Sequence, residues 1–171
     1  MKRSQKLILF LLLLVLSGVT GFYLWYNSRP PQTQEIPTKP EVTQLPAQLP
    51  FLALNAFEYP PQKQKSIIFY FHPECDHCGF EADDIHKQLE GFQDTQLIWI
   101  SPVDTTTIRQ FAQDHQLDQV SNIHWMSDTA NVFPKMFNPD LLPSSWVFDQ
   151  NGKLLKHFNG QTKPESLLKF L

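Results

Sequence analysis

The sequence predicts a three-layer α/β fold, in which a central mixed sheet is flanked by helices. Strand and helix patterns alternate in the first part of the folded region, and a hairpin followed by a helix closes the chain. In addition, a Cys-x-x-Cys motif directly follows a buried strand and opens a helix. The chain has 171 residues, of which 42% are hydrophobic, and this is enough for the core of one such domain.

The N-terminal segment is a candidate membrane anchor. Residues 7–26 contain no charged side chain, and about 20 apolar residues suffice for a helix to cross a bilayer. Three basic side chains in residues 1–6 predict that this end stays in the cytoplasm and that the rest is exported. A cleaved signal peptide with Leu7–Leu16 as its apolar core is the alternative, although no Ala-x-Ala-like site follows it. We expect a single-pass transmembrane signal anchor in the cell inner membrane, with the domain facing the periplasm or the outside.

Residues 27–50 form the predicted linker. They hold six prolines and several glutamines and show no apolar periodicity, a composition typical of an extended tether. The folded domain is therefore expected over residues 51–171. Beyond residue 29 the chain carries ten basic and seventeen acidic side chains. This negative charge argues against a nucleic acid partner, whose phosphates would repel the domain.

The N-terminal half of the domain follows a strand–helix–strand order. Phe51–Leu54 is a short edge-strand candidate, and Ser66–His72 is apolar enough for a buried central strand. The helix that starts at Cys75 is expected to end just before Gly91, because glycine is a helix stop signal. Gln96–Ile100 is apolar and bounded by polar residues, which predicts a second buried strand.

The C-terminal half contains two helices, a fourth strand, and a hairpin with its own helix. In order, the predicted elements are a helix capped by Asp104 or Thr105 that runs to about His115, a strand at Ile123–Met126, a short helix at Thr129–Phe137, strands at Ser144–Asp149 and Leu154–Phe158, and a helix at Glu165–Phe170 opened by Pro164. The Asn151-Gly152 pair tolerates the positive φ values of a two-residue primed turn, so the last two strands are expected to form a hairpin.

The segment Cys75-Asp76-His77-Cys78 contains both cysteines of the chain. Two intervening residues let the sulfurs reach bonding distance across one helical turn, so the pair is either a redox dithiol or half of a metal site. Cys75 is the expected nucleophile, because unpaired backbone N–H groups at the helix N-terminus favour its thiolate. Cys78, one turn further, is the expected resolving thiol, and the two would form a redox disulfide.

Over residues 51–171 the chain resembles the thioredoxin superfamily. The resemblance rests on the strand Ile67–Phe71, on the paired cysteines at the start of a helix, and on Pro143 ahead of the strand Ser144–Asp149 and its hairpin. It implies that Leu142–Pro143 is a cis bond close to the cysteines. It also implies that the backbone beside this bond docks an extended substrate segment.

Glu81 and His77 are the candidates for tuning the two thiols. The spacing of Cys78, Glu81 and Ala82 places them on one inner helix face, with the carboxyl beside Cys78. Partial desolvation there would raise the pKa of this carboxyl, which could then shuttle the Cys78 proton; the alternative is an ordinary acid on a helix face. A charged His77 would stabilise the Cys75 thiolate and make the pair more oxidising; the alternative is an exposed histidine with no special role.

The chain resembles two branches of the superfamily, each through a different residue. A glutamate three residues after the second cysteine is similar to the membrane-tethered, extracytoplasmic TlpA/ResA type, which reduces apocytochrome c or other exported proteins. A histidine between the cysteines is similar to the oxidising, disulfide-forming branch. Glu74 and Phe69 depart from cytoplasmic thioredoxin, which has an aromatic residue before the first cysteine and a buried aspartate six residues before it. Glu81 is therefore the residue expected to act as the general base for Cys78.

Two other functions compete with disulfide exchange. A peroxiredoxin needs a hydroxyl residue three positions before its reactive cysteine, and this chain has His72 there. A copper or zinc carrier would use Cys75, Cys78 and a histidine, since thiolates and imidazole suit both ions. However, thioredoxin-like copper chaperones separate their cysteines by three residues, and this chain separates them by two.

These observations predict a membrane-tethered, extracytoplasmic thiol–disulfide oxidoreductase without a cofactor, acting as a reductase. Its expected protein partners are exported thiol or disulfide substrates and a membrane electron-transfer partner that resets the cysteine pair. Residues 7–26 provide the expected contact with the membrane.

Overall fold

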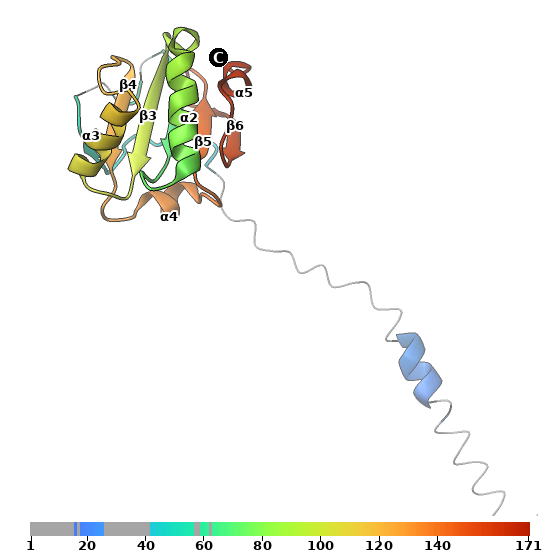
Figure 1. Cartoon of the computed structure of the whole chain (residues 1–171). Coiled ribbons are helices and arrows are strands. Elements are labelled where there is room, and N and C mark those ends of the chain that lie inside the picture. Colours follow the sequence, from blue (N-terminus) through green and yellow to red (C-terminus); the bar gives the residue numbers. More distant parts are fainter. Residues whose placement is uncertain (1–15, 17, 26–41, 57–58, 62) are drawn as a thin grey trace, which may run out of the picture. The chain divides into compact units, whose positions relative to one another are not determined.

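The computed structural model describes residues 16, 18–25, 42–56, 59–61 and 63–171, and the chain divides into two units, residues 1–38 and 39–171. In the first unit, residues 18–25 are helical (Figure 1, blue). Most of the predicted anchor at residues 7–26 and much of the predicted linker at 27–50 lie outside the described residues. Within the part of the chain that is described, no helix combines the length and hydrophobicity that a membrane crossing requires.

The second unit is built on a six-stranded mixed sheet with the order β1-β4-β3-β2-β5-β6. Its strands are β1 (Leu52–Ala53), β2 (Lys65–Tyr70), β3 (Thr95–Ser101), β4 (Ile123–Ser127), β5 (Ser144–Phe148) and β6 (Leu154–Asn159). β2, β3 and β4 are parallel to one another, whereas β1, β5 and β6 pair antiparallel with their neighbours. The predicted mixed sheet is confirmed.

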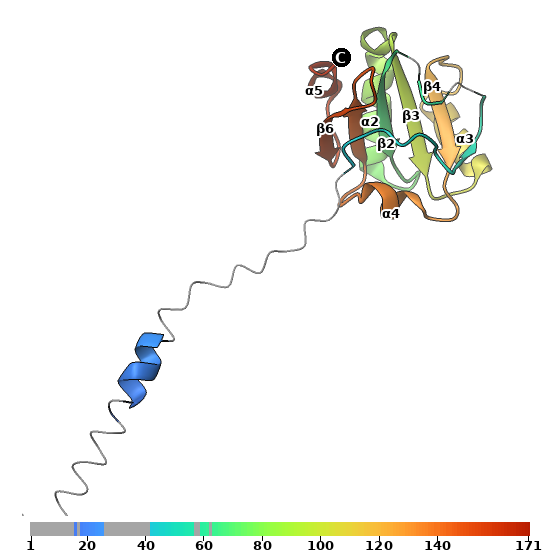
Figure 2. The same ribbon diagram turned by 180° about the vertical axis from the view of Figure 1, so that it is seen from behind.

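Helices cover both faces of this sheet, which confirms the three layers (Figures 1 and 2). They are α2 (Asp76–Lys87), the 3₁₀ helix η1 (Leu89–Phe92), α3 (Thr105–Asp114), α4 (Phe133–Phe137) and α5 (Pro164–Leu168). Buried residues of α2, α3 and α5 belong to one hydrophobic cluster, and those of α4 belong to a second cluster on the other face.

The central strand β2 supplies both clusters, because successive side chains of a strand point to opposite faces. Ile67 and Phe69 belong to the cluster beneath α2 and α3, whereas Ile68 and Tyr70 belong to the cluster beneath α4. All four are buried, as the apolar run in the sequence predicts. Phe69, which occupies the position of the buried aspartate of thioredoxin, stacks on Trp99 with ring centroids 4.4 Å apart.

A segment that we call the strap, residues 42–51, belongs to the folded unit. It crosses the α4 face of the sheet (Figure 2, cyan), where Leu45, Leu49 and Phe51 pack on the second cluster. Backbone hydrogen bonds join it to the β5–β6 hairpin, with Leu45 N–H donating to the Gly152 carbonyl at 2.6 Å. The folded unit therefore extends further toward the N-terminus than residue 51, where the sequence placed its start.

Three local features differ from the sequence predictions. The first helix ends at Lys87, and Gly91 lies within η1 instead of stopping the helix. The helix after β4 begins at Phe133, because the Asp128 carboxylate accepts hydrogen bonds from the backbone N–H groups of Val132 and Phe133 and holds the preceding residues in a turn.

The third difference is in the β5–β6 hairpin, which does not have a two-residue primed turn. Only Gly152 has a positive φ, of 75°, whereas a primed turn of type I′ needs positive values at both Asn151 and Gly152. The Asp149 N–H donates to the Lys153 carbonyl and the Gly152 N–H to the Asp149 carbonyl. These bonds describe a three-residue loop that closes with a left-handed glycine.

Candidate active site

Cys75 is the N-cap residue of α2, just beyond the end of β2. Its N–H donates to the carbonyl of His72 at 3.0 Å, and its own carbonyl accepts from Cys78 N–H at 2.9 Å. Cys75 is partly exposed, and Cys78 is fully buried; both are free thiols. The sulfur of Cys75, just after β2, thus lies at the surface, and the sulfur of Cys78, in the first turn of α2, lies in the interior.

Burial makes the two thiols chemically different. It raises the pKa of the Cys78 thiol, while a backbone hydrogen bond from His72 acts in the opposite sense. Cys75 and Glu81 add smaller effects that raise the Cys78 pKa further, because a second negative charge nearby is unfavourable. Cys78 therefore keeps its proton in the reduced site until a base removes it.

The Leu142–Pro143 bond lies beside the reactive pair and is cis, as the resemblance implies. Cys75 Sγ lies 3.9 Å from the carbonyl oxygen of Leu142, to which the thiol donates a weak hydrogen bond. Pro143 directly precedes β5, the antiparallel neighbour of β2, and this pairing brings the two segments together. The role of this backbone in docking a substrate stays a prediction.

Glu81 is on the inner face of α2 and only 1% exposed. One carboxyl oxygen, Oε1, accepts a hydrogen bond from Thr162 N–H at 3.3 Å, and the buried Oε2 makes no hydrogen bond with the described residues. Desolvation raises the pKa of Glu81 to about 8, against the lowering effect of the Thr162 bond. A carboxyl group with this pKa exchanges its proton near neutral pH.

His77 lies exposed between the cysteines, and its partner is Gln161, 84 positions away. Nδ1 of the ring is 2.9 Å from Gln161 Oε1. Because a carbonyl oxygen only accepts, Nδ1 must carry a hydrogen. No pattern in the sequence predicts a role for Gln161, which is a polar residue just after Gly160 at the end of a strand.

Gln161 belongs to a segment, residues 160–162, that contacts three parts of the site. Gly160 has a φ of 83° and its N–H donates to the Pro143 carbonyl at 2.8 Å. Gln161 contacts His77 and Thr162 contacts Glu81. The segment thus connects the cis proline, the residue between the cysteines and the buried acid.

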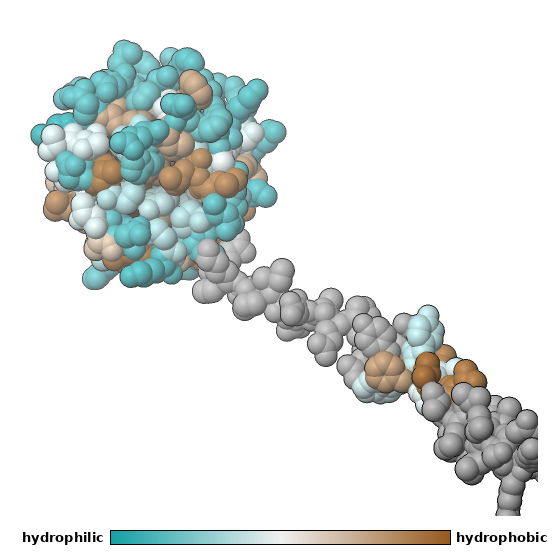
Figure 3. Space-filling model, turned by 60° about the horizontal axis from the view of Figure 1, so that its bottom comes forward, coloured by the Kyte–Doolittle hydropathy of each residue, from teal (hydrophilic) through white to brown (hydrophobic). Residues whose placement is uncertain are grey.

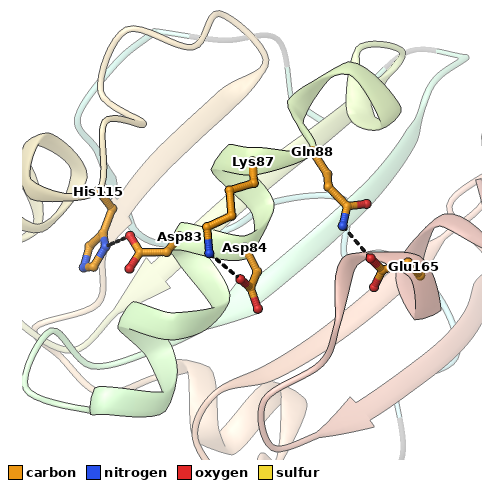
Figure 4. A network of polar contacts seen from close by, with 6 residues as sticks. All are labelled: Asp83, Asp84, Lys87, Gln88, His115 and Glu165. Atoms are coloured by element: carbon orange, nitrogen blue, oxygen red, sulfur yellow. Dashed lines mark hydrogen bonds and ion pairs between the residues drawn. The ribbon is translucent and has the colours of Figure 1, made fainter.

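Polar contacts on both sides of α2 hold the helix in place (Figure 4). On one side, His115 Nδ1 lies 2.6 Å from Asp83 Oδ1, at the end of α3. On the other, Gln88 Nε2 donates to Glu165 of α5 at 2.5 Å. The ring of His115 also occupies the space beside Gly79, where a Cβ would lie 3.2 Å from its Cε1 atom. These contacts fix α2, and with it the cysteine pair, relative to its neighbours.

The donor set for a metal ion is limited. Among the residues described, no group of three or more His, Cys, Asp or Glu side chains is arranged to hold one.

Comparison with known proteins agrees with this architecture. A sequence profile of the AhpC/TSA family matches residues 47–157. The chain belongs to the AhpC/TSA family. Membership in this family, together with the cysteine pair at the head of α2, makes the protein a thiol-dependent redox enzyme of the thioredoxin superfamily. No curated protein sequence matches the chain significantly.

Solved structures share the fold at low sequence identity. StoA from Bacillus subtilis is 17% identical with a TM-score of 0.55, over 65% of this chain and 84% of that one. The bacterioferritin comigratory protein of Xanthomonas campestris is 12% identical with a TM-score of 0.58, over 76% and 93%. Peroxidoxin BcpB from Mycobacterium tuberculosis is 16% identical with a TM-score of 0.53, over 62% and 77%. These likenesses confirm the thioredoxin-like fold.

Proposed function

We propose that the protein is an extracytoplasmic thiol–disulfide oxidoreductase that reduces disulfides in exported proteins. The observation that carries this proposal is the asymmetry of the pair: Cys75 is accessible at the head of α2, and Cys78 is buried beside a carboxyl group whose pKa is about 8. Attack on the substrate disulfide needs an accessible sulfur, and release of the substrate needs a second one. Cys75 suits the first role and Cys78 the second.

In the first step, the Cys75 thiolate attacks one sulfur of a substrate disulfide. A Cys75–substrate bond forms, the substrate S–S bond breaks, and the departing sulfur leaves as a thiolate that takes a proton from water. The backbone at Leu142, next to Cys75 Sγ, is positioned to hold the substrate segment. The product of this step is a mixed disulfide.

In the second step, Cys78 attacks Cys75 Sγ and releases the remaining substrate thiol. Cys78 must first lose its proton, and we assign its acceptance to ionised Glu81, which is buried on the same helix and whose charge acts on Cys78. The enzyme is left with a Cys75–Cys78 disulfide, and the substrate has gained two electrons and two protons. A dithiol donor must then reduce the pair, and we assign this task to a membrane electron-transfer partner.

We propose the reducing direction from the state of the two thiols. A couple becomes oxidising when a thiolate stabilises its reduced form, and Cys78, whose burial raises its pKa, supplies no thiolate at neutral pH. A charged His77 would act in the opposite direction by stabilising the Cys75 thiolate. We propose that the exposed His77 does not do so strongly enough to make the couple oxidising, and that residues 7–26 tether the enzyme to the inner membrane.

Peroxide reduction is the second candidate, because the chain belongs to the AhpC/TSA family and shares its fold with proteins described as a peroxidoxin and as active on alkyl peroxides. His72 stands three residues before Cys75 in place of a hydroxyl group, and its Nδ1 accepts from Glu74 N–H at 3.3 Å. Consumption of an alkyl hydroperoxide by the reduced protein tests this candidate directly.

The deciding experiment is the reduction potential of the Cys75–Cys78 couple in the full chain, equilibrated against glutathione or dithiothreitol buffers. A value of about −250 mV or lower agrees with a reductase, and one above about −150 mV would reverse the direction. The Cys78→Ser variant is the control, because it should form mixed disulfides without releasing them. If the pair shows no reversible two-electron couple, disulfide exchange is excluded, and peroxide reduction and metal binding remain as hypotheses.

A further inference from the structure

Exposed apolar side chains gather around the reactive cysteine. Within residues 42–171, the large hydrophobic side chains described as exposed are Leu52, Phe80, Leu141, Leu142 and Leu155. Phe80 is 55% exposed on the first turns of α2, and Leu141 and Leu142 are 58% and 36% exposed just before the cis proline. Single exposed apolar residues need no explanation, but three beside a reactive thiol indicate a contact surface.

Polar residues link these apolar side chains around Cys75, and we call the combined surface the docking face. Leu142 contacts Cys75 through its carbonyl, and Leu141 lies over Gly160, with its Cδ1 atom 3.9 Å from the position of a Cβ there. The next residue, Gln161, contacts His77, and the His77 ring lies 6.3 Å from the Phe80 ring. Figure 3 shows the end of the domain at which α2 begins, with brown apolar residues surrounded by hydrophilic ones.

The docking face is built from residues 72–80, 139–143 and 158–162, and its charge has one sign. These segments contain Glu74, Asp76 and Asp140 and no lysine or arginine. All three acids are exposed. An approaching anionic segment would be repelled at the sulfur, and a cationic one attracted.

We propose that the docking face binds an extended apolar segment of an exported protein whose disulfide is flanked by lysine or arginine. This inference rests on the proposed function and specifies its substrate class. Leucine-like side chains of the segment would cover Leu141, Leu142 and Phe80, and its basic flanks would lie near Glu74, Asp76 and Asp140. The acids therefore select among substrates and the apolar residues provide contact area.

The test uses two peptides that share a cyclic disulfide and a central leucine and differ only in their flanks, two lysines or two glutamates. Reduced full-length protein is mixed with each, and the rate of disulfide transfer is measured at about 20 mM and about 500 mM salt. Each rate is divided by that of dithiothreitol with the same peptide, because flanking charge changes the intrinsic reactivity of a disulfide. We expect a lysine-to-glutamate ratio of about ten at low salt that falls to about two at high salt.

Variants that replace acids of the docking face with neutral amides test whether these acids cause the preference for lysine flanks. In Glu74→Gln/Asp140→Asn the ratio should fall at least threefold, whereas in Asp118→Asn, an exposed acid in the loop between α3 and β4, it should not change. A ratio near one in the parent at low salt, or a preference for glutamate, would overturn the inference. Failure to reduce either peptide in a protein with a reversible couple would also overturn it. A protein without such a couple would instead refute the proposed function.

Discussion

Glu81 is an ionisable side chain that the fold holds in an apolar setting, one helical turn from the resolving sulfur. A carboxyl group with a pKa of about 8 is mostly neutral at pH 7. No cation among the described residues forms an ion pair with this buried carboxyl. Only a small fraction of it is ionised and able to accept a proton at pH 7. The same burial has a consequence for stability that can be measured without a substrate.

The Glu81→Gln variant should become more stable than the parent as pH rises. Between pH 4.5 and about 8 the folded protein keeps a proton that the unfolded chain releases, so the stability of the parent falls through this range. Glutamine has no proton to lose. The difference in the free energy of unfolding should be near zero at pH 4 and reach about 5 kcal/mol at most by pH 9.

Urea unfolding of the reduced protein at several pH values measures this difference. Glu90→Gln, at an exposed acid of η1, is the matched control and should show no such trend. A constant difference between Glu81→Gln and the parent across this range would show that Glu81 does not titrate with a raised pKa.

Gln161 acts on the site through His77. Its carbonyl oxygen accepts a hydrogen bond from Nδ1 of the ring and so fixes the ring between the two cysteines, where we expect it to favour the reduced pair. Gln161→Leu should therefore lower the reduction potential by about 20 mV, equivalent to about 1 kcal/mol for one hydrogen bond. The same substitution in a His77→Ala background should have no effect, and an undiminished shift there would mean that Gln161 acts by another route.

At the scale of elements, the helices are positioned by polar groups at their ends as well as by their buried faces. Asp104 caps α3, with one oxygen accepting from Thr106 N–H at 2.8 Å and from Thr107 N–H at 3.1 Å. The opposite end of α3 carries His115, which contacts Asp83 of α2. A correctly capped α3 thus supports the helix that bears the cysteines.

Replacing Asp104 with alanine should reduce the free energy of unfolding by about 1–2 kcal/mol, because two N–H groups of the first turn lose their acceptor. Chemical denaturation at neutral pH measures the loss. Asp118→Ala, in the exposed loop after the helix, should be nearly neutral. Equal losses in the two variants would assign the effect to charge and not to capping.

At the scale of the whole domain, the strap completes the second hydrophobic cluster. Phe51 packs on Phe133 of α4 with ring centroids 6.0 Å apart, and the strap is hydrogen-bonded to the β5–β6 hairpin. In the described part of the domain, one short helix, α4, lies on this face of the sheet, so the strap covers apolar surface that would otherwise contact water.

Phe51→Ala should cost about 2 kcal/mol of stability, less than the loss for a fully buried phenylalanine, because Phe51 is half-buried. The neighbouring Leu52 is 65% exposed, so Leu52→Ala should change stability little. Thermal unfolding of both variants makes the comparison. A Phe51→Ala variant as stable as Leu52→Ala would show that the strap does not contribute to the core.

The sequence alone determined the elements whose signals are local. The apolar run of β2, the cysteine pair at the start of α2 and the inward position of Glu81 all follow from periodicities of two or of three to four residues. The cis bond and its place beside the cysteines came from the family resemblance, because a proline ahead of a strand is not distinctive by itself.

Only the tertiary structure decided which distant residues meet. Cys75 and Leu142 are 67 positions apart, and His77 and Gln161 are 84 apart. Residues 42–50 of the strap were predicted as linker, because their prolines and glutamines suppress any periodic pattern, although Leu45 and Leu49 pack on the sheet. Such contacts depend on how the strands pair and how the chain packs around the sheet. The type of a single residue does not indicate which distant residue it will contact.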